Sequence, residues 1–205
     1  MANSKNLADL KRLLKNESAR ATVQADSAYF KPPPMTSVPG VAHAIVEIPK
    51  GQRNKFEVDK HTGLIRLDRY LSGSTHYPMD YGFIPQTLAE DGDPLDVVLL
   101  VREPTFSGCL VHARVIGLLN MIEKKEQDTK VLAVPLNDPF FRDVRHLKDV
   151  PSSFLAEVEH FFNVYKQLEG GKIETLGWVG AREALAEIDR TAWMYREAKR
   201  LITHT

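Results

Sequence analysis

Apolar and polar residues alternate through the middle of the chain, and this pattern predicts a series of short β-strands. Turn-forming residues separate the segments, and no helical pattern interrupts them. Such an arrangement favours an antiparallel sheet that closes into a small barrel. The predicted strands are 42–48, 53–58, 64–67, 96–101, 109–118 and 130–134.

Helical spacing of apolar residues is found at both ends of the chain. A helix is predicted after Pro151, ending at Gly170, and a second from 181 to about 201. Near the start, leucines at helical spacing predict one short amphipathic helix within 1–26, with Ser4 as a possible N-cap. Packing on the surface of the domain or of a partner explains this helix better than a catalytic role does.

Three consecutive prolines at 32–34 stop any helix and predict an extended connector. We therefore divide the chain into an N-terminal extension, residues 1–40, and a single domain, residues 41–205. The expected fold is mainly β with flanking helices, two of them in the C-terminal half.

Composition narrows the range of functions. Lys plus Arg and Asp plus Glu both number 27, so no overall basic field exists to attract nucleic acid. The single cysteine, Cys109, permits no internal disulfide, which agrees with a reducing compartment. No apolar run approaches the length of about 18 residues that a spanning helix needs, and the charged N-terminal region does not resemble a secretory signal. We expect a cytoplasmic protein without a membrane partner.

Three carboxylates lie within six residues, at Asp91, Asp93 and Asp96, in a Gly- and Pro-containing loop that leads into an apolar strand. Acids this close repel one another unless a cation neutralises them, and Mg²⁺ is bound in this way. A solvated acidic turn explains the stretch equally well. A calcium loop of the EF-hand type does not, because position six from Asp91 is Asp96 rather than Gly and position twelve is Arg102 rather than Glu.

Further polar residues lie in strands and at helix ends where a purely structural element would not favour them. Taken singly, each is explained by surface charge or by a half-buried tyrosine. Together with the acidic loop, they could bind metals through the acids and an anion through Lys, Arg and Tyr, as phosphoryl transfer requires. These residues are Glu47, Lys55, Glu57, Arg69, Tyr77, Tyr81, Asp128, Lys130, Tyr165, Lys166 and Lys172.

The heptapeptide 91–97, Asp-Gly-Asp-Pro-Leu-Asp-Val, resembles the signature of the family I soluble inorganic pyrophosphatases. The likeness covers about 40–178, roughly two-thirds of the chain. Further blocks that match in order are 45–49, 55–57, 67–70, 77–85, 128–135 and 160–166.

The resemblance implies a five-stranded OB-like closed barrel flanked by helices, Mg²⁺ dependence, and hydrolysis of pyrophosphate to two phosphates by a metal-activated water. It implies several Mg²⁺ ions per site, with Mn²⁺ or Zn²⁺ as possible substitutes, and a homo-oligomer, with the hexamer favoured. By motif match, Asp91, Asp96 and Asp128 would bind the tighter metals, Glu47 and Glu57 would serve the metals that arrive with substrate, and Asp93 would deprotonate the water. Lys55, Arg69, Lys130, Tyr165 and Lys166 would bind the phosphates, with Tyr81 assisting and Tyr77 and Lys172 in the same pocket.

One departure concerns the metals. The family usually has an Asp-Glu pair where this chain has Glu123 and Lys124. Glu123 keeps a carboxylate on a longer arm and stays a candidate ligand, whereas Lys124 cannot bind a metal. Two other functions remain open: a non-catalytic OB-type barrel that binds nucleotide or nucleic acid, and a metal-dependent phosphohydrolase acting on nucleotides.

Overall fold

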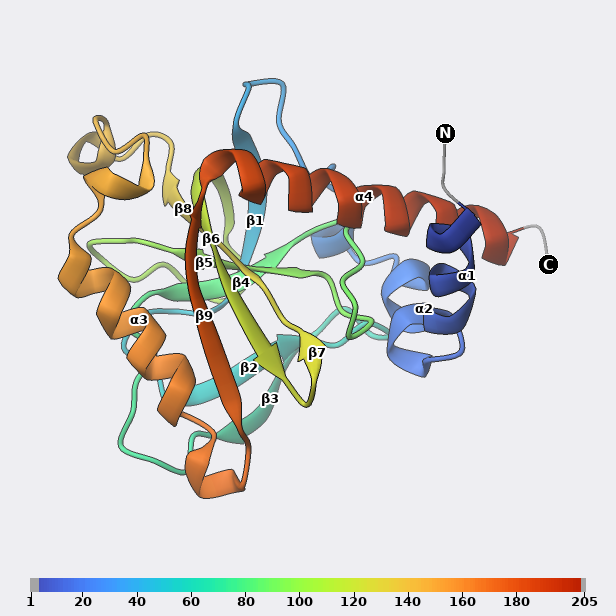
Figure 1. The fold of residues 1–205 in the computed structure, drawn as a ribbon, viewed down its shortest axis with the longest axis horizontal. Coiled ribbons are helices and arrows are strands. Elements are labelled where there is room, and N and C mark those ends of the chain that lie inside the picture. Colours follow the sequence, from blue (N-terminus) through green and yellow to red (C-terminus); the bar gives the residue numbers. More distant parts are fainter. Residues whose placement is uncertain (1–3, 204–205) are drawn as a thin grey trace.

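Five strands form a closed ring in the computed structural model, which describes residues 4–203 (Figure 1). The order around the ring is β1-β4-β5-β8-β6, and β1 pairs with β6 to close it. The expected five-stranded OB-like barrel is thereby confirmed. The strands are β1 (Val41–Ile48), β4 (Asp80–Ile84), β5 (Leu95–Leu99), β6 (Leu110–Glu123) and β8 (Lys130–Pro135).

The expectation of a wholly antiparallel sheet is wrong at one place, because β5 and β8 run parallel. Parallel neighbours need a long crossover connection, and the chain between these strands supplies one that contains β6 and the short β7 (Glu126–Gln127). The parallel pairing sets Asp96 beside Lys130 in register. This pairing brings an acid of the acidic loop next to a predicted phosphate ligand.

Two predicted strands lie outside the ring, and three observed strands, β4, β7 and β9 (Ile173–Gly180), were not predicted. β2 (Asn54–Val58) and β3 (Ile65–Tyr70) form a separate hairpin. β4 was missed because its sequence Asp-Tyr-Gly-Phe-Ile lacks a clear alternation of apolar and polar residues. β9 was missed because the glycine pair at 170–171 was interpreted only as the end of the preceding helix. β9 pairs with β6 at the edge of the sheet.

Helices cover the ring. α3 (Ser152–Val164) and α4 (Ala181–Thr203) correspond to the two helices predicted in the C-terminal half, but α3 ends at Val164 instead of Gly170, and a separate 3₁₀ turn fills part of the difference. The single helix predicted within 1–26 is instead two, α1 (Ser4–Leu13) and α2 (Glu17–Gln24), because Asn16 caps α2 by accepting a hydrogen bond from the Ser18 amide at 2.9 Å. Short 3₁₀ helices are Ala28–Phe30, Pro139–Phe141, Leu147–Asp149 and Gln167–Glu169.

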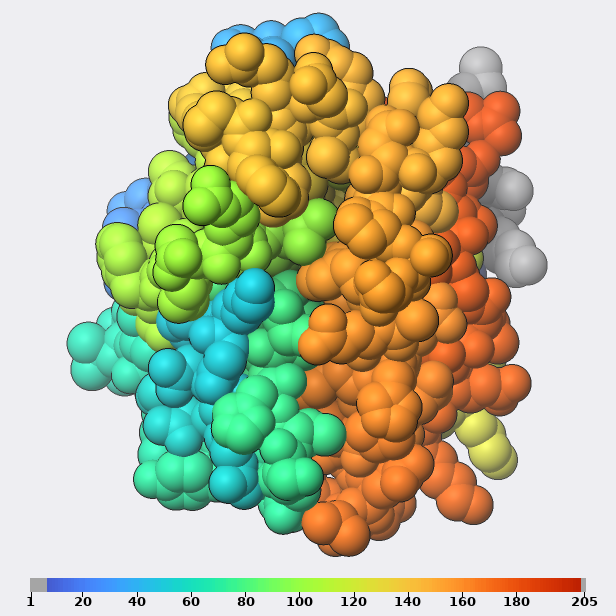
Figure 2. Space-filling model, turned by 90° about the vertical axis from the view of Figure 1, so that its left-hand side faces the viewer, coloured from blue at the N-terminus to red at the C-terminus, as the bar shows by residue number. Residues whose placement is uncertain are grey.

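Buried apolar residues join the helices to the sheet. Phe161 and Phe162 of α3 pack in one cluster with strands of the ring, and Ile188 of α4 packs in another. Figure 2 shows the face that α3 covers, in orange, with the gold segment before it alongside. Within residues 4–203 no helix is both long and apolar enough to cross a membrane.

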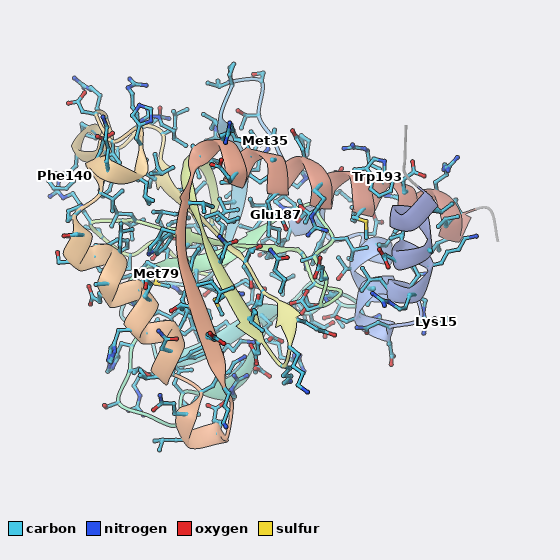
Figure 3. The ribbon with its side chains drawn as sticks, in the orientation of Figure 1. Lys15, Met35, Met79, Phe140, Glu187 and Trp193 are labelled. Atoms are coloured by element: carbon cyan, nitrogen blue, oxygen red, sulfur yellow. The ribbon has the colours of Figure 1, made fainter. Side chains whose placement is uncertain are left out.

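The N-terminal extension packs against the C-terminal half of α4 (Figure 1). Leu10 of α1 and Val23 of α2 are buried with Tyr195 of α4, and Trp193 borders the same cluster. Figure 3 shows Trp193 on α4 beside α1, with Lys15 at the turn between α1 and α2. This packing fixes α2 independently of any polar contact that it makes.

Candidate active site

One cleft of about 500 Å³ collects nearly all of the predicted site residues. Its lining comes from the acidic loop, the β2–β3 hairpin, β1, β4, the end of β6, the start of β8, the residues after α3, and α2. All predicted catalytic and metal-binding residues line it, whereas Arg69, Tyr77 and Lys172, which were predicted to bind the phosphates, do not. The predicted residues that line the cleft are Glu47, Lys55, Glu57, Tyr81, Asp91, Asp93, Asp96, Glu123, Asp128, Lys130, Tyr165 and Lys166.

The acidic loop owes its shape to a glycine and to its own hydrogen bonds. Gly92 has a φ of 92°, which favours glycine, and it separates Asp91 from Asp93. The Asp93 amide donates to Asp91 Oδ1 at 2.9 Å, and the Ala89 amide donates to the Asp93 carbonyl at 2.8 Å. These bonds close a tight turn that points both acids toward the cleft.

Lys130 lies between two of the predicted metal ligands. Its ammonium group donates to Asp96 Oδ2 and to Asp128 Oδ1, and its side chain is only 3% exposed. Burial alone would lower the pKa of Lys130, but the two carboxylates outweigh it and raise that pKa, so the lysine is cationic at neutral pH. A buried cation with two acids forms the centre of the site.

Two carboxyl groups resist ionisation because they are buried beside other acids. Burial, together with the charge of Asp96 and Glu57, raises the pKa of Glu47 to about 8 even though the Val58 amide donates to its Oε1 at 2.7 Å. Burial and the neighbouring acids raise the pKa of Asp91 to about 7. Carboxylates in this condition are stabilised by a cation, and an all-oxygen donor set suits Mg²⁺ or a similar hard ion. The residues therefore fit a divalent metal by their chemistry.

Lysine ammonium groups contact other acids of the cleft. Lys55 donates to Glu57, and Lys166 donates to both carboxylate oxygens of Glu123 at 2.7 and 2.6 Å. In this arrangement no three metal-binding side chains among residues 4–203 lie close enough together to hold an ion. An entering divalent cation would take over the carboxylates, and the ammonium groups would then be available to phosphate oxygens.

Arg69 does not line the cleft. Its guanidinium bonds to Asp68 at 2.6 Å and to Glu169 at 3.0 Å, which links β3 to the 3₁₀ turn after α3. Its charge still acts on Tyr165, where it opposes the other influences on the pKa of that phenol. Arg69 thus lies at the rim.

Tyrosines form the aromatic wall. Burial raises the pKa of Tyr81 and of Tyr165 well above the ordinary value, so both keep their phenolic protons and can donate hydrogen bonds. Tyr77 is 2% exposed and packs behind Tyr81, with ring centroids 5.6 Å apart. Neither Tyr77 nor the exposed Lys172 lines the cleft.

Two residues that the sequence did not single out touch Asp93. Lys60, in the turn between β2 and β3, donates to Asp93 Oδ1, and Ser18 of α2 donates to the same oxygen at 2.5 Å. Lys60 could have been suspected, since it lies three residues after Glu57 on a hairpin that enters the site. Nothing in the sequence marks Ser18, because 75 residues separate it from Asp93.

Glu123 and Lys124 stand where the resembled family usually has an Asp-Glu pair. Glu123 is the last residue of β6, and Lys124 lies in the turn that leads to β7. Lys124 and Lys125 have positive φ values of 51° and 71°, as the two central residues of a tight hairpin turn require. Both are exposed, and only Glu123 of this group lines the cleft. The structure thus keeps the carboxylate of the pair at the site and places Lys124 outside the cleft lining.

Comparison with known proteins gives one consistent family. The family model described as inorganic pyrophosphatase matches residues 44–196. The inorganic pyrophosphatase of Halalkalibacterium halodurans is 48% identical over 162 residues, which cover 79% of this chain and 99% of that relative. That of Streptomyces coelicolor is 50% identical over 153 residues, covering 74% and 94%.

The solved structures agree in fold. The inorganic pyrophosphatase of Thermus thermophilus superposes with a TM-score of 0.79 at 40% identity, covering 83% of this chain and 99% of that one. The enzyme of Neisseria gonorrhoeae gives the same TM-score at 33% identity. Because the matched proteins are covered almost completely while the family match begins at residue 44, α1 and α2 lie outside the shared part.

Proposed function

This chain belongs to the inorganic pyrophosphatase family, and from that premise we propose that it hydrolyses pyrophosphate to two orthophosphates with Mg²⁺ as the metal. The family implies a divalent metal and pyrophosphate as substrate. The observation that carries the proposal for this chain is one cleft that joins a group of carboxyl groups, two of them with raised pKa values, to a group of lysines and tyrosines.

The acids would hold the metals. Asp91, Asp96 and Asp128 are the proposed ligands of the tighter ions, and Glu47, Glu57 and Glu123 would serve those that accompany substrate. When bound, the metals supply Lewis-acid polarisation of phosphate oxygens and lower the pKa of water. Because Lys124 replaces a family carboxylate, we propose that the affinity for the substrate-associated ions, or the preferred metal, differs in this chain, and that Mn²⁺ or Zn²⁺ can substitute.

Asp93 would act as the general base. Burial alone would raise its pKa, but the charge and hydrogen bond of Lys60, with the bond from Ser18, outweigh it and hold the pKa below its usual value. The carboxyl group is therefore ionised at neutral pH and ready to orient the attacking water and take its proton. With Oδ1 bound by both donors, Oδ2 is the oxygen offered to the water.

Cationic and phenolic donors would bind the phosphates. Lys55, Lys130 and Lys166 would turn from their carboxylates toward the substrate once metals take those acids. The protonated phenols of Tyr81 and Tyr165 would donate hydrogen bonds, and Arg69 would reach in from the rim. Such donors neutralise the charge that develops on the leaving phosphate.

The same proposal includes a cytoplasmic location and a homo-oligomer, with the hexamer favoured, on the strength of the composition and the family resemblance. A barrel that merely binds nucleic acid is not favoured, because the carboxylates of the cleft would repel a phosphodiester chain.

The test is phosphate release from pyrophosphate, with and without Mg²⁺ and with ATP as a competing substrate. We expect fast Mg²⁺-dependent release from pyrophosphate and almost none from ATP. In Asp93→Asn the amide cannot accept the proton, so kcat should fall by about 100-fold or more while the fold is retained. Glu90→Gln, in the same loop but exposed, is the matched control. Near-normal turnover by Asp93→Asn would remove Asp93 from the role of base.

A further inference from the structure

We propose that the N-terminal extension completes this active site: Ser18 of α2 is a positioning residue that, together with Lys60, fixes the carboxylate of Asp93. The inference rests on the proposed function, in which Asp93 is the base. It assigns a role in the reaction to a segment that lies before the part of the chain matched by the family.

The contact itself is a closed triangle of polar groups. Ser18 Oγ donates to Asp93 Oδ1 at 2.5 Å and accepts from Lys60 Nζ at 2.7 Å, while Lys60 Nζ also donates to Asp93 Oδ1. Both donors therefore engage one oxygen of the carboxylate. Within residues 4–203 no side chain is bonded to Oδ2, so this oxygen would take the proton of the attacking water.

The backbone of the acidic loop is bound to the same helix. Thr22 Oγ1 donates to the Gly92 carbonyl at 2.8 Å, and Asn16 Nδ2 donates to the Asp91 carbonyl at 3.2 Å. A Cβ on Gly92 would lie 2.9 Å from the backbone nitrogen of Ala19, so only glycine permits this approach. Loop and helix are fitted to each other at the main chain as well as at Ser18.

Apolar packing fixes α2 without help from Ser18. Ala19 and Val23 are buried with Met194, Tyr195 and Ala198 of α4. Removing the Ser18 hydroxyl therefore leaves the helix in place and takes away one hydrogen bond to Asp93. Because the hydroxyl is neutral, its removal also leaves the charge of the site unchanged.

The consequence for catalysis is geometric. A base held by Lys60 alone is fixed by one flexible four-carbon side chain and can rotate about χ1 and χ2. A second donor on the same oxygen restricts that rotation and keeps Oδ2 in line with the water. Misorientation of a catalytic group slows the chemical step more than it weakens ground-state binding.

The test compares variants of the full chain at saturating Mg²⁺. Supporting residues of this kind typically contribute about 10-fold or more, so Ser18→Ala should lower kcat by about 10-fold with KM unchanged within about twofold. Ser18→Thr keeps the hydroxyl and should restore most of kcat. Arg20→Ala is the control on the same helix, because Arg20 is exposed and donates to the Leu14 carbonyl rather than to the acidic loop; its kcat should stay close to that of the wild type.

Three results would overturn the inference: wild-type kcat in Ser18→Ala, an equal loss in Arg20→Ala, or no recovery in Ser18→Thr. Circular dichroism of each variant shows whether the fold is retained. If Asp93→Asn is inactive while Ser18→Ala is normal, the inference fails and the proposed function stands. If the wild type releases no phosphate from pyrophosphate, the proposed function fails first. In the Asp93→Asn background, Ser18→Ala should cause no further loss of kcat.

Discussion

Gly82 of β4 faces the backbone of β1, and a side chain of any size there would prevent the two strands from pairing. A Cβ at this position would lie 1.8 Å from the Ile45 carbonyl oxygen and 2.8 Å from its carbon. Backbone atoms within a closed ring cannot move aside cheaply. We expect Gly82→Ala to lower the free energy of unfolding by about 3 kcal/mol or more, measured by urea denaturation.

Gly73→Ala is the control for that substitution. Its nearest neighbour, Thr75 Oγ1, would be 3.7 Å from the new Cβ, which is an ordinary contact. The free energy of unfolding should change by no more than about 0.5 kcal/mol. Equal effects of the two substitutions would show that loss of glycine flexibility, rather than the clash with β1, sets the stability.

Some individual site residues could be predicted from the sequence, and others could not. Asp91, Asp93 and Asp96 were recognisable because they are close in the chain, and Tyr81 and Lys130 because their blocks match a family. Lys60 and Ser18 belong to no such block, and only folding brings them to Asp93. Their placement depends on tertiary packing, for which residue spacing gives no signal.

At the scale of elements, two predicted phosphate ligands, Tyr165 and Lys166, directly follow α3. Hydrogen bonds between two side chains attach this end of α3 to β9. Asn163 Nδ2 donates to Thr175 Oγ1 at 2.9 Å, and the Thr175 amide donates back to Asn163 Oδ1 at 3.3 Å. Asn163→Ala should loosen this end and raise the KM for pyrophosphate severalfold, with a smaller change in kcat. Steady-state kinetics at saturating Mg²⁺ would measure both.

Gln167→Ala serves as the control at this end of α3. Gln167 is exposed and donates to the Asn163 carbonyl at 3.0 Å, but it makes no bond to β9. Its KM should match that of the wild type. A KM that rises equally in both variants would mean that the helix end itself, rather than its attachment to β9, governs phosphate binding.

Elements with a strong pattern could be predicted, and elements defined by their neighbours could not. β1 and α4 were found almost to their bounds, because alternation and helical spacing are long and clear there. β4 and β9 depend on the strands beside them, β1 and β6, for their conformation. The parallel pair of β5 and β8 likewise follows from ring closure, which no local pattern encodes.

The whole molecule has a net charge of zero, although its cleft is rich in carboxylates. The folded-state pKa values of Glu47, about 8, and Asp91, about 7, lie above the ordinary values of 4.5 and 3.8. The folded protein therefore keeps protons that the unfolded chain releases, so the stability that these groups give at low pH is lost as pH rises toward 8. Asp93 and Asp68 have lowered pKa values, so the stability that they contribute is lost as pH falls, but only below about pH 4.

Urea denaturation in EDTA should accordingly show a free energy of unfolding that falls between pH 5 and pH 8. Glu47→Gln keeps an acceptor for the Val58 amide but cannot ionise, so its profile should be flatter than that of the wild type. Mg²⁺ at about 100 times its Kd should add about 2.7 kcal/mol at pH 8, since it binds only the folded site. A profile in Glu47→Gln as steep as in the wild type would assign the pH dependence to other groups, and an unchanged stability with Mg²⁺ would argue against a metal site in this cleft.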